Sequence, residues 1–276
     1  MDWKNLSKRA AVAAVAAPLI LWAAWRGGLA FFVFVEVIIL LGLLEFYQFA
    51  KAKGMHPNQL LGVIAGLMLG AQIYFRGDHG IWLTEMFLVV LLVLVELFRN
   101  KGSALHNTSV TLLGFAYVAG LWSFMLLIRE LPRAMNFNYD SAGTWIVMLL
   151  ATTWACDIAA YFCGLAFGRH KLFERVSPKK TWEGAIGGLI FAILMAMASH
   201  YWFVRDLRLS DAIVIGFIIG TIGQMSDLAE SLFKRDAGVK DSSSLIPGHG
   251  GVLDRFDSEM LVAPLVYLYL LLALPH

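Results

Sequence analysis

One segment of this 276-residue chain is far richer in reactive side chains than the rest, and it runs from residue 224 to residue 257. Carboxylates alternate there with lysines and arginines, and glycines surround a single histidine. The members with chemical potential are Asp227, Ser231, Lys234, Arg235, Lys240, Asp241, His249, Gly250, Gly251, Asp254, Arg255 and Asp257. Proteins bind Mg²⁺ through one or two carboxylates together with substrate phosphates, while Lys and Arg neutralise the remaining phosphate oxygens. The segment therefore predicts a metal-assisted phosphate site.

The spacing within this segment supports such a site. Asp227 and Ser231 are one helical turn apart, and Asp254 and Asp257 are similarly spaced if a helix begins near them. The stretch from residue 248 to 251 is rich in glycine, so its backbone N–H groups can approach an anion closely. A solvated loop that binds lipid headgroups would explain any single charge here, but it explains the whole set poorly.

A second polar segment, residues 164–183, carries Lys179 and Lys180 between the hydroxyl residues Ser177 and Thr181. We interpret both lysines as phosphate contacts. The two hydroxyl groups have two interpretations that stay open, because each suits either the N-cap of the following helix or a bound phosphate. These roles are compatible, since a helix N-terminus is itself an anion site.

Acidic residues also occur within the apolar runs of the chain. Asp157 lies inside such a run, where a carboxylate is costly, so we assign it to substrate binding, with a structural hydrogen bond to another helix as the alternative. The other acids of this kind lack polar neighbours in the sequence, and we interpret them as packing or interface residues. They are Glu36, Glu45, Glu85 and Glu96.

The composition identifies the kind of protein that must position these residues. Apolar residues make up 59% of the chain and charged residues only 15%, and the mean hydropathy is +0.70. A soluble domain has about 25% charged residues, and disordered chains are poor in apolar ones. Cys156 and Cys163 would lie roughly 10 Å apart along one helix, too far for a disulfide, so we interpret them as packing residues. The chain is predicted to be an all-α, polytopic integral membrane protein.

A spanning helix needs about 20 mostly apolar residues, and nine segments qualify, of which the first and third are the weakest. The first also resembles a signal peptide, but a retained helix agrees better with the charge bias described below. The predicted spans are residues 10–25, 29–50, 59–75, 81–98, 108–128, 143–163, 184–204, 211–230 and 258–274. We expect residues 1–142 to form a scaffold and residues 143–276 to form the catalytic region, with polar loops at 164–183 and 231–257.

The distribution of basic residues predicts the orientation. With nine spans, sixteen of the 22 Lys and Arg residues fall in segments on the same side as the N-terminus, and six fall on the other side. Basic residues favour the cytoplasmic side. The N-terminus and both long polar loops are therefore predicted to face the cytoplasm.

The run from Ser231 to Asp257 resembles the signature of the phosphatidate cytidylyltransferases, also called CDP-diacylglycerol synthases, and the resemblance covers roughly the C-terminal half of the chain. The matching residues are Ser231, Phe233, Lys234, Arg235, Lys240, Asp241, Ser243, Ile246, Pro247, His249, Gly250, Gly251, Asp254, Arg255, Phe256 and Asp257. The segments around Asp157 and from Ser177 to Gly184 look like upstream blocks of the same family. The N-terminal helices match only in general character.

This resemblance implies transfer of CMP from CTP to phosphatidic acid, which yields CDP-diacylglycerol and pyrophosphate in phospholipid biosynthesis. It also implies Mg²⁺ as the cofactor and the bacterial inner membrane as the location, with the active site facing the cytoplasm. The expected partners are CTP, phosphatidic acid and membrane lipid, without nucleic acid. A homodimer stays open.

On this basis we assign roles within the predicted site. Asp227 and Asp254 are the leading Mg²⁺ ligands, Asp241 and Asp257 are weaker candidates, and the number of ions stays open between one and two. Phosphate contacts are assigned to Lys179, Lys180, Lys240 and Arg255. His249 either donates a hydrogen bond to phosphate or orders its glycine loop. Substrate binding is further assigned to Asp157, Ser177, Thr181, Ser231, Lys234, Arg235, Gly250 and Gly251.

Two other classes of protein remain as alternatives. A CTP-dependent polyprenol or phytol kinase would transfer phosphate to an alcohol and release CDP. A secondary transporter would place polar groups near the membrane midplane in two repeated halves. Here the polar groups gather towards one face and no second half mirrors them, so an enzyme is the better prediction.

Overall fold

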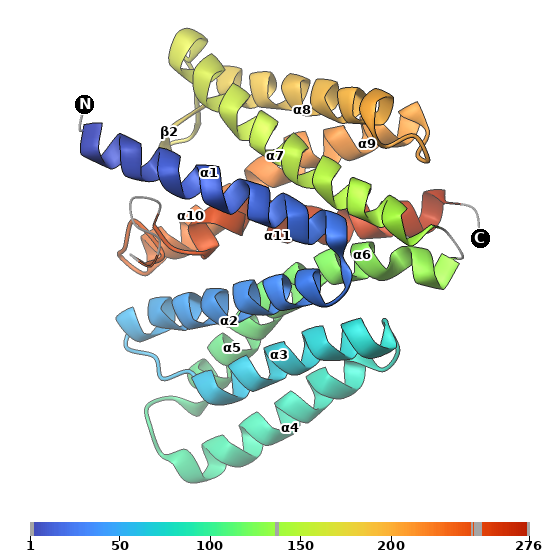
Figure 1. Ribbon diagram of the computed structural model, residues 1–276. Coiled ribbons are helices and arrows are strands. Elements are labelled where there is room, and N and C mark those ends of the chain that lie inside the picture. The colour runs from blue at the N-terminus through green and yellow to red at the C-terminus, as the bar shows by residue number, and fades with distance from the viewer. Residues whose placement is uncertain (1–2, 136–137, 244, 246–249, 275–276) are drawn as a thin grey trace. The chain divides into compact units, whose positions relative to one another are not determined.

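The computed structural model describes residues 3–135, 138–243, 245 and 250–274 of the chain, with side chains from residue 14 onward except that of Ala134. In these residues the regular elements are helices, apart from one short hairpin (Figure 1). The hairpin joins β1 (Lys171–Phe173) to β2 (Ser177–Thr181) and lies within the predicted loop 164–183. The all-α prediction is confirmed, and the hairpin is an addition that the sequence did not predict.

Seven helices are long and apolar enough to cross a membrane, judged by length and composition in the described part of the chain. They are α2 (Gly28–Ala52), α3 (Gln59–Arg76), α4 (Ile81–Arg99), α7 (Tyr139–Phe167), α8 (Trp182–Trp202), the continuous Leu209–Asp236 helix and α11 (Leu253–Ala273). The Leu209–Asp236 helix comprises α9 (Leu209–Ile218), the π-helical turn η2 (Ile219–Gly223) and α10 (Gln224–Asp236). A polytopic membrane protein is therefore confirmed.

One bent pair of helices makes an eighth span if the pair is counted as a single span, against the predicted nine. The helix α5 (Ala104–Gly114) continues as the π-helical turn η1 (Phe115–Gly120) and then meets α6 (Phe124–Met135) at 41°. A π-helical turn is a common cause of such kinks. The first predicted span lies in α1 (Trp3–Arg26). The side chains of α1 are described only from Ala14 to Arg26, and this apolar stretch is shorter than a span. The count of nine and the orientation stay predictions.

The chain folds into two compact units. The first contains the residues up to Ala23, Gly27–Leu127 and Phe233–Phe256, and the second contains Ala24–Arg26, Ile128–Leu232 and the residues from Asp257 onward. The units therefore divide the chain differently from the predicted boundary at residue 142, because segment 233–256 belongs with the N-terminal helices. The scaffold and catalytic roles assigned to the two halves stay predictions.

Close helix packing in the first unit explains why α3 is weakly hydrophobic. α2 lies beside α3, and α3 lies beside α4 (Figure 1). Gly62, Gly66 and Gly70 recur every fourth residue on α3, and a Cβ at any of them would collide with a side chain of α2. Small residues at this spacing allow two membrane helices to approach closely. The glycines lower the hydropathy of α3 while they improve its packing.

Glycines serve the same purpose where α7 meets α8 in the second unit. A Cβ at Gly187 would lie 2.5 Å from Cys163 Sγ, and a Cβ at Gly188 would lie 3.1 Å from Cys156 Sγ. Both cysteines are free thiols. Their predicted role as packing residues is confirmed.

Arg129 on α6 is a fully buried cation in the second unit. Its guanidinium donates to the carbonyl oxygens of Ala24 at 3.1 Å, Trp25 at 3.2 Å and Tyr139 at 2.9 Å, and it lies 4.0 Å from the centre of the Tyr139 ring. Ala24 and Trp25 belong to the last turn of α1, whose carbonyls have no partners within the helix. Arg129 therefore ties the end of α1 into this unit.

Replacing Arg129 with Met is expected to destabilise the protein by about 3 kcal/mol, because the carbonyl groups of Ala24, Trp25 and Tyr139 lose their donor. Thermal unfolding of the purified protein in detergent measures this loss. Arg133 on the same helix is the matched control: its side chain is 53% exposed, so Arg133→Met should cost less than Arg129→Met. Equal losses in the two variants would contradict the role of Arg129.

Candidate functional site

Lys180 and Asp227 bring the two polar segments of the sequence together within the second unit. Lys180 Nζ lies 2.5 Å from Asp227 Oδ2, and each side chain is 28% exposed. One turn further along α10, Ser231 Oγ donates to Asp227 Oδ1 at 3.4 Å. A partly exposed carboxylate beside an ammonium group suits a charged ligand such as phosphate or a metal ion. The sequence predicted this meeting of residues from segments 47 positions apart.

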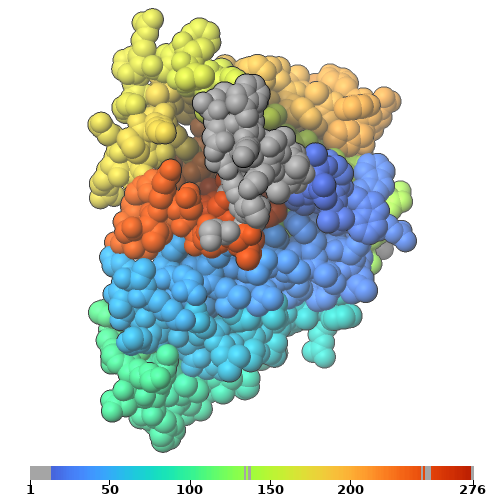
Figure 2. All heavy atoms as spheres, turned by 60° about the vertical axis from the view of Figure 1, so that its left-hand side comes forward, coloured from blue at the N-terminus to red at the C-terminus, as the bar shows by residue number. Residues whose placement is uncertain are grey.

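The β1–β2 hairpin positions Lys180. Its strands pair antiparallel, with Lys171 opposite Thr181 and Phe173 opposite Ser177, and the hairpin reaches the surface in Figure 2 (yellow). Successive side chains of a strand point to opposite faces. Lys180 therefore faces Asp227, while the exposed Lys179 belongs to the opposite face of β2. This geometry favours Lys180 over Lys179 as a partner of an anion beside Asp227.

The start of α8 fixes the end of the hairpin. Thr181 is the N-cap, and its hydroxyl oxygen accepts a hydrogen bond from the Gly184 N–H at 3.2 Å. Glu183 accepts from the backbone N–H groups of Arg169 at 3.1 Å and His170 at 3.2 Å, and it pairs with the His170 ring at 2.6 Å. The capping interpretation of Thr181 is confirmed. Phosphate binding by Thr181 and by Ser177, which is half-buried in β2, stays a prediction.

Ser226, which the sequence analysis did not single out, joins α10 to α11 in the second unit. This buried serine donates from its Oγ to the carbonyl oxygen of Asp257 and accepts from the Leu261 N–H at 3.2 Å. It directly precedes Asp227, so the contact fixes the register of the helix that carries Asp227. The only indication of this contact in the sequence was a small polar residue beside a carboxylate.

Two further predicted site residues lie in the second unit. The Asp257 carboxylate accepts from the Ser258 N–H at 2.8 Å. Asp157 is exposed on α7.

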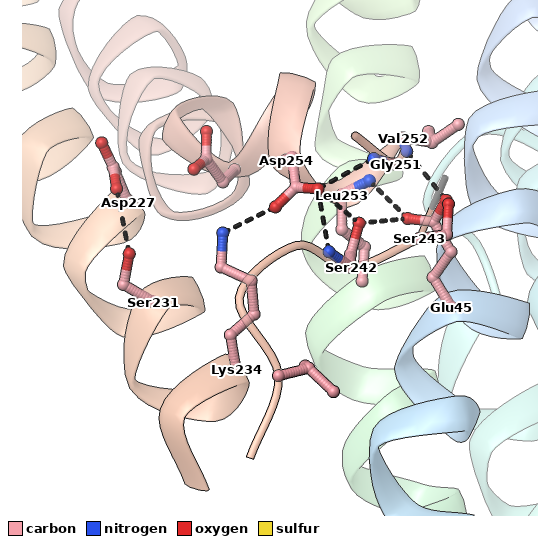
Figure 3. Close-up of polar contacts among 12 residues, drawn as sticks. Glu45, Asp227, Ser231, Lys234, Ser242, Ser243, Gly251, Val252, Leu253 and Asp254 are labelled. Atoms are coloured by element: carbon pink, nitrogen blue, oxygen red, sulfur yellow. Dashed lines mark hydrogen bonds and ion pairs between the residues drawn. The ribbon is translucent and has the colours of Figure 1, made fainter. Parts of the chain in front are cut away.

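A second charged cluster lies in the first unit around Asp254 (Figure 3). The Asp254 side chain is 6% exposed. Its Oδ1 accepts from Lys234 Nζ at 2.6 Å. Its Oδ2 accepts from the N–H groups of Ser242 at 2.9 Å and Gly251 at 2.8 Å, and it lies 3.0 Å from Ser242 Oγ. Both carboxylate oxygens are therefore already engaged by donors of the protein.

Glu45 corrects the sequence analysis, which treated it as a packing residue without polar neighbours. This carboxylate on α2 is 5% exposed and accepts four hydrogen bonds. The donors are Ser242 Oγ at 2.8 Å, Ser243 Oγ at 2.6 Å, and the N–H groups of Val252 and Leu253, both at 2.9 Å (Figure 3). Its partners are about 200 residues away in the sequence, so no local spacing could have revealed them.

Glu96 also has polar partners that the sequence analysis did not foresee. It is buried on α4, pairs with Arg99 at 2.7 Å and accepts from the Asn107 side chain at 3.3 Å. These contacts join α4 to α5 within the first unit, away from the contacts of Glu45 and Asp254. Glu96 is therefore a structural carboxylate.

Gly250 and Gly251 allow the backbone to approach these carboxylates. Gly250 has a φ of +86°, which L side chains rarely adopt. A Cβ at Gly251 would collide with Ser242 Oγ and would lie 2.5 Å from both oxygens of Glu45. The sequence predicted that glycine would let N–H groups reach an anion, and in the described residues the anions reached are Glu45 and Asp254. His249 lies outside the described residues.

The polar loop is shorter than predicted. Because α10 continues to Asp236 and α11 begins at Leu253, the connection covers residues 237–252 rather than 231–257. Of the predicted site residues, Ser231, Lys234 and Arg235 therefore lie on α10, whereas Asp254, Arg255 and Asp257 lie on α11. Lys240 and Asp241 lie in the loop, and both are exposed, as are Arg235 and Arg255. Their assigned roles stay predictions.

No group of three or more His, Cys, Asp and Glu side chains that could hold a metal ion occurs among the described residues. Mg²⁺ does not require such a group, because it keeps water and phosphate ligands beside one or two carboxylates. Asp227 fits this pattern, since it is partly exposed and already faces a cation. Asp254 fits it only if Lys234 moves away from Oδ1.

The long apolar helices and the ion pairs Lys180–Asp227 and Lys234–Asp254 define a polytopic membrane protein with charged clusters suited to phosphate chemistry. The chain belongs to the cytidylyltransferase family, whose model matches residues 7–273. This match confirms the resemblance and extends it to the N-terminal helices.

Several curated relatives carry the name phosphatidate cytidylyltransferase. The one from Synechocystis sp. is 34% identical over 271 residues, which cover 90% of this chain and 91% of the relative. The one from Brucella suis is 36% identical over 282 residues, covering 96% and 93%. The one from Haemophilus influenzae is 33% identical over 278 residues, covering 94% of each chain. The similarity therefore extends over nine tenths or more of the chain.

Proposed function

We propose that this protein is a phosphatidate cytidylyltransferase, which transfers CMP from CTP to phosphatidic acid and releases CDP-diacylglycerol and pyrophosphate in phospholipid biosynthesis. The observation that carries the proposal is the match to relatives of that name over 90% or more of the chain. The charged clusters agree with two phosphate-bearing substrates. The apolar helices agree with a substrate that resides in the membrane.

The chemistry requires little from a general base. The second pKa of a phosphomonoester is about 6, so the headgroup of phosphatidic acid is already anionic near neutral pH. One of its oxygens attacks the α-phosphorus of CTP, and the bond from that phosphorus to the bridging oxygen of pyrophosphate breaks. The protein must bring two anions together and stabilise the departing charge, which is a task of positioning and electrostatics.

The lysines of the two clusters suit this task. Lys180 is positioned by the hairpin and Lys234 by α10; Lys180 lies 2.5 Å from the Asp227 carboxylate and Lys234 lies 2.6 Å from the Asp254 carboxylate. An ammonium group can donate up to three hydrogen bonds, so each lysine can also contact phosphate oxygens. Lys240, Arg255 and Lys179 are further phosphate contacts in this proposal, and His249 donates to phosphate or orders its loop.

Mg²⁺ is the proposed cofactor, held by Asp227 and Asp254, with Asp241 and Asp257 as weaker ligands. Asp227 is the better supported of the two leading residues, since its carboxylate is partly exposed. When bound, the ion would neutralise phosphate charge and favour departure of pyrophosphate. One ion or two are both compatible with this set of carboxylates.

The proposed location is the bacterial inner membrane, with the active site on the cytoplasmic face, where CTP is present. The excess of Lys and Arg in the segments that share a side with both polar loops supports this orientation. Phosphatidic acid would then reach the site from the inner leaflet. A homodimer stays a prediction.

Position-specific labelling of CTP tests the proposed function. Purified protein with Mg²⁺, phosphatidic acid and CTP labelled at the α-phosphorus should yield labelled lipid, whereas label at the γ-phosphorus should appear in pyrophosphate. Diacylglycerol, which lacks the phosphate, is the matched acceptor and should give no product. Transfer of the γ-label to a lipid alcohol would instead identify a kinase. Absence of any covalent product would favour a transporter.

A further inference from the structure

Glu45 has an unusually complete set of partners for an acid in an apolar helix. Each of its two oxygens accepts one hydroxyl and one backbone N–H: Ser243 and Val252 at Oε1, and Ser242 and Leu253 at Oε2. A carboxylate has about four acceptor positions, so all of them are used. Such a complete match indicates a built contact rather than an incidental one.

These four donors come from both sides of the loop 237–252. Ser242 and Ser243 lie in its first half, whereas Val252 is its last residue and Leu253 is the first residue of α11. The first N–H groups of a helix lack partners within the helix, and a negative charge near them is favourable. Glu45, on a different helix, therefore acts as the cap of α11 and at the same time closes the loop against α2.

The same contacts lead directly to Asp254. Ser242 Oγ lies 2.8 Å from Glu45 Oε2 and 3.0 Å from Asp254 Oδ2, so this hydroxyl group lies between the two carboxylates and donates its single proton to one of them at a time (Figure 3). The backbone N–H of Ser242 binds the same oxygen of Asp254. The position of Asp254, and with it the lysine partner of Asp254, thus depends on how Glu45 holds the loop.

We propose that Glu45 is a positioning residue for the reaction, which acts by holding the glycine-rich loop and Asp254 in their working arrangement. Glu45 touches neither substrate in this proposal. The N-terminal region, predicted as scaffold, then contributes to catalysis through one side chain. This inference rests on the proposed function.

The variant Glu45→Gln tests the proposal with almost no change in shape. The amide NH₂ of Gln cannot accept, and whichever way it is turned it faces the N–H of Val252 or of Leu253. A serine hydroxyl can turn to accept from the amide, but a backbone N–H cannot. We expect hydrogen exchange of the amides from residue 250 to residue 254 to accelerate. We expect kcat to fall about 10–100-fold, which is typical when a residue that hydrogen-bonds to and orients a binding group is replaced. We expect KM to change less than about threefold.

Glu96→Gln is the matched control, because Glu96 is also a buried carboxylate of the first unit but contacts Arg99 and Asn107 instead of the loop. It should leave both the exchange of the loop and kcat at wild-type values. If Glu45→Gln fails to fold, Ser243→Ala removes one of the four donors and should give a smaller change in the same two measurements.

Three outcomes would overturn the proposal. The first is wild-type exchange and wild-type kcat in Glu45→Gln, and the second is faster exchange with unchanged kcat, which would make Glu45 a helix cap alone. The third is an equal loss in Glu96→Gln. If the wild-type protein forms no CDP-diacylglycerol, the proposed function fails, whereas the exchange measurement still reports whether Glu45 anchors the loop.

Discussion

Replacing Asp227 with Asn should lower the rate of CDP-diacylglycerol formation by about 100-fold or more while the protein stays folded. The change removes the negative charge that faces Lys180 and keeps the shape of the side chain. Little stability should be lost, because an ion pair with partly exposed side chains contributes less than a buried one. Labelled lipid formed from CTP labelled at the α-phosphorus measures activity, and thermal unfolding in detergent measures folding.

Asp236 provides the matched control for this variant. It lies on the same helix as Asp227, is 64% exposed and pairs with Lys53 at 2.8 Å in the first unit. Asp236→Asn should retain activity within about twofold, since an exposed pair of this kind contributes little. Normal turnover in Asp227→Asn would remove that carboxylate from the proposed metal ligands.

Replacing Asp254 with Asn should abolish activity and also destabilise the protein, by about 3–5 kcal/mol. The Asp254 side chain is almost fully buried, and Asn offers only one accepting atom in place of two. The side-chain NH₂ of Asn, which is a donor, would then face either the ammonium group of Lys234 or the N–H groups of Ser242 and Gly251, which are donors too. The melting temperature and the rate of lipid labelling, measured on the same preparation, check both expectations.

The contrast between the two aspartates separates their roles. Asp227→Asn should lose activity with little change in melting temperature, whereas Asp254→Asn should lose activity and also have a lower melting temperature. Asp241, which is exposed in the loop, is the control for stability, and Asp241→Asn should leave the melting temperature unchanged. An unchanged melting temperature in Asp254→Asn would show that its hydrogen bonds do not support the fold.

Much of the architecture could be predicted because the membrane imposes length and apolarity on each helix. Even α3 was identified, although its glycines lower its hydropathy. The break between η1 and α6 was missed, since a π-helical turn has no clear signal in composition. The end of α10 was also misplaced, because charged residues continue its last turns and resemble a loop.

The candidate site was predictable only where residue type revealed it. Lys180 and Asp227 stood out because charges are rare in this chain, and Thr181 was placed by the typical pattern at a helix start. Glu45 gave no such signal, since its surroundings in the sequence are apolar and its partners lie at the other end of the chain. Ser226 was missed because the register that it fixes is a property of packing.

The arrangement around Gly251 has a consequence for how the chain can vary. The space beside its Cα is filled by oxygen atoms of Glu45 and Ser242, so even the methyl group of alanine would displace them. Gly238, just beyond the end of α10, also has a positive φ, but no atom lies within 4 Å of the place that a methyl group would take there. Substitution at Gly238 therefore strains only the local backbone, whereas substitution at Gly251 would push apart two segments that are distant in the chain.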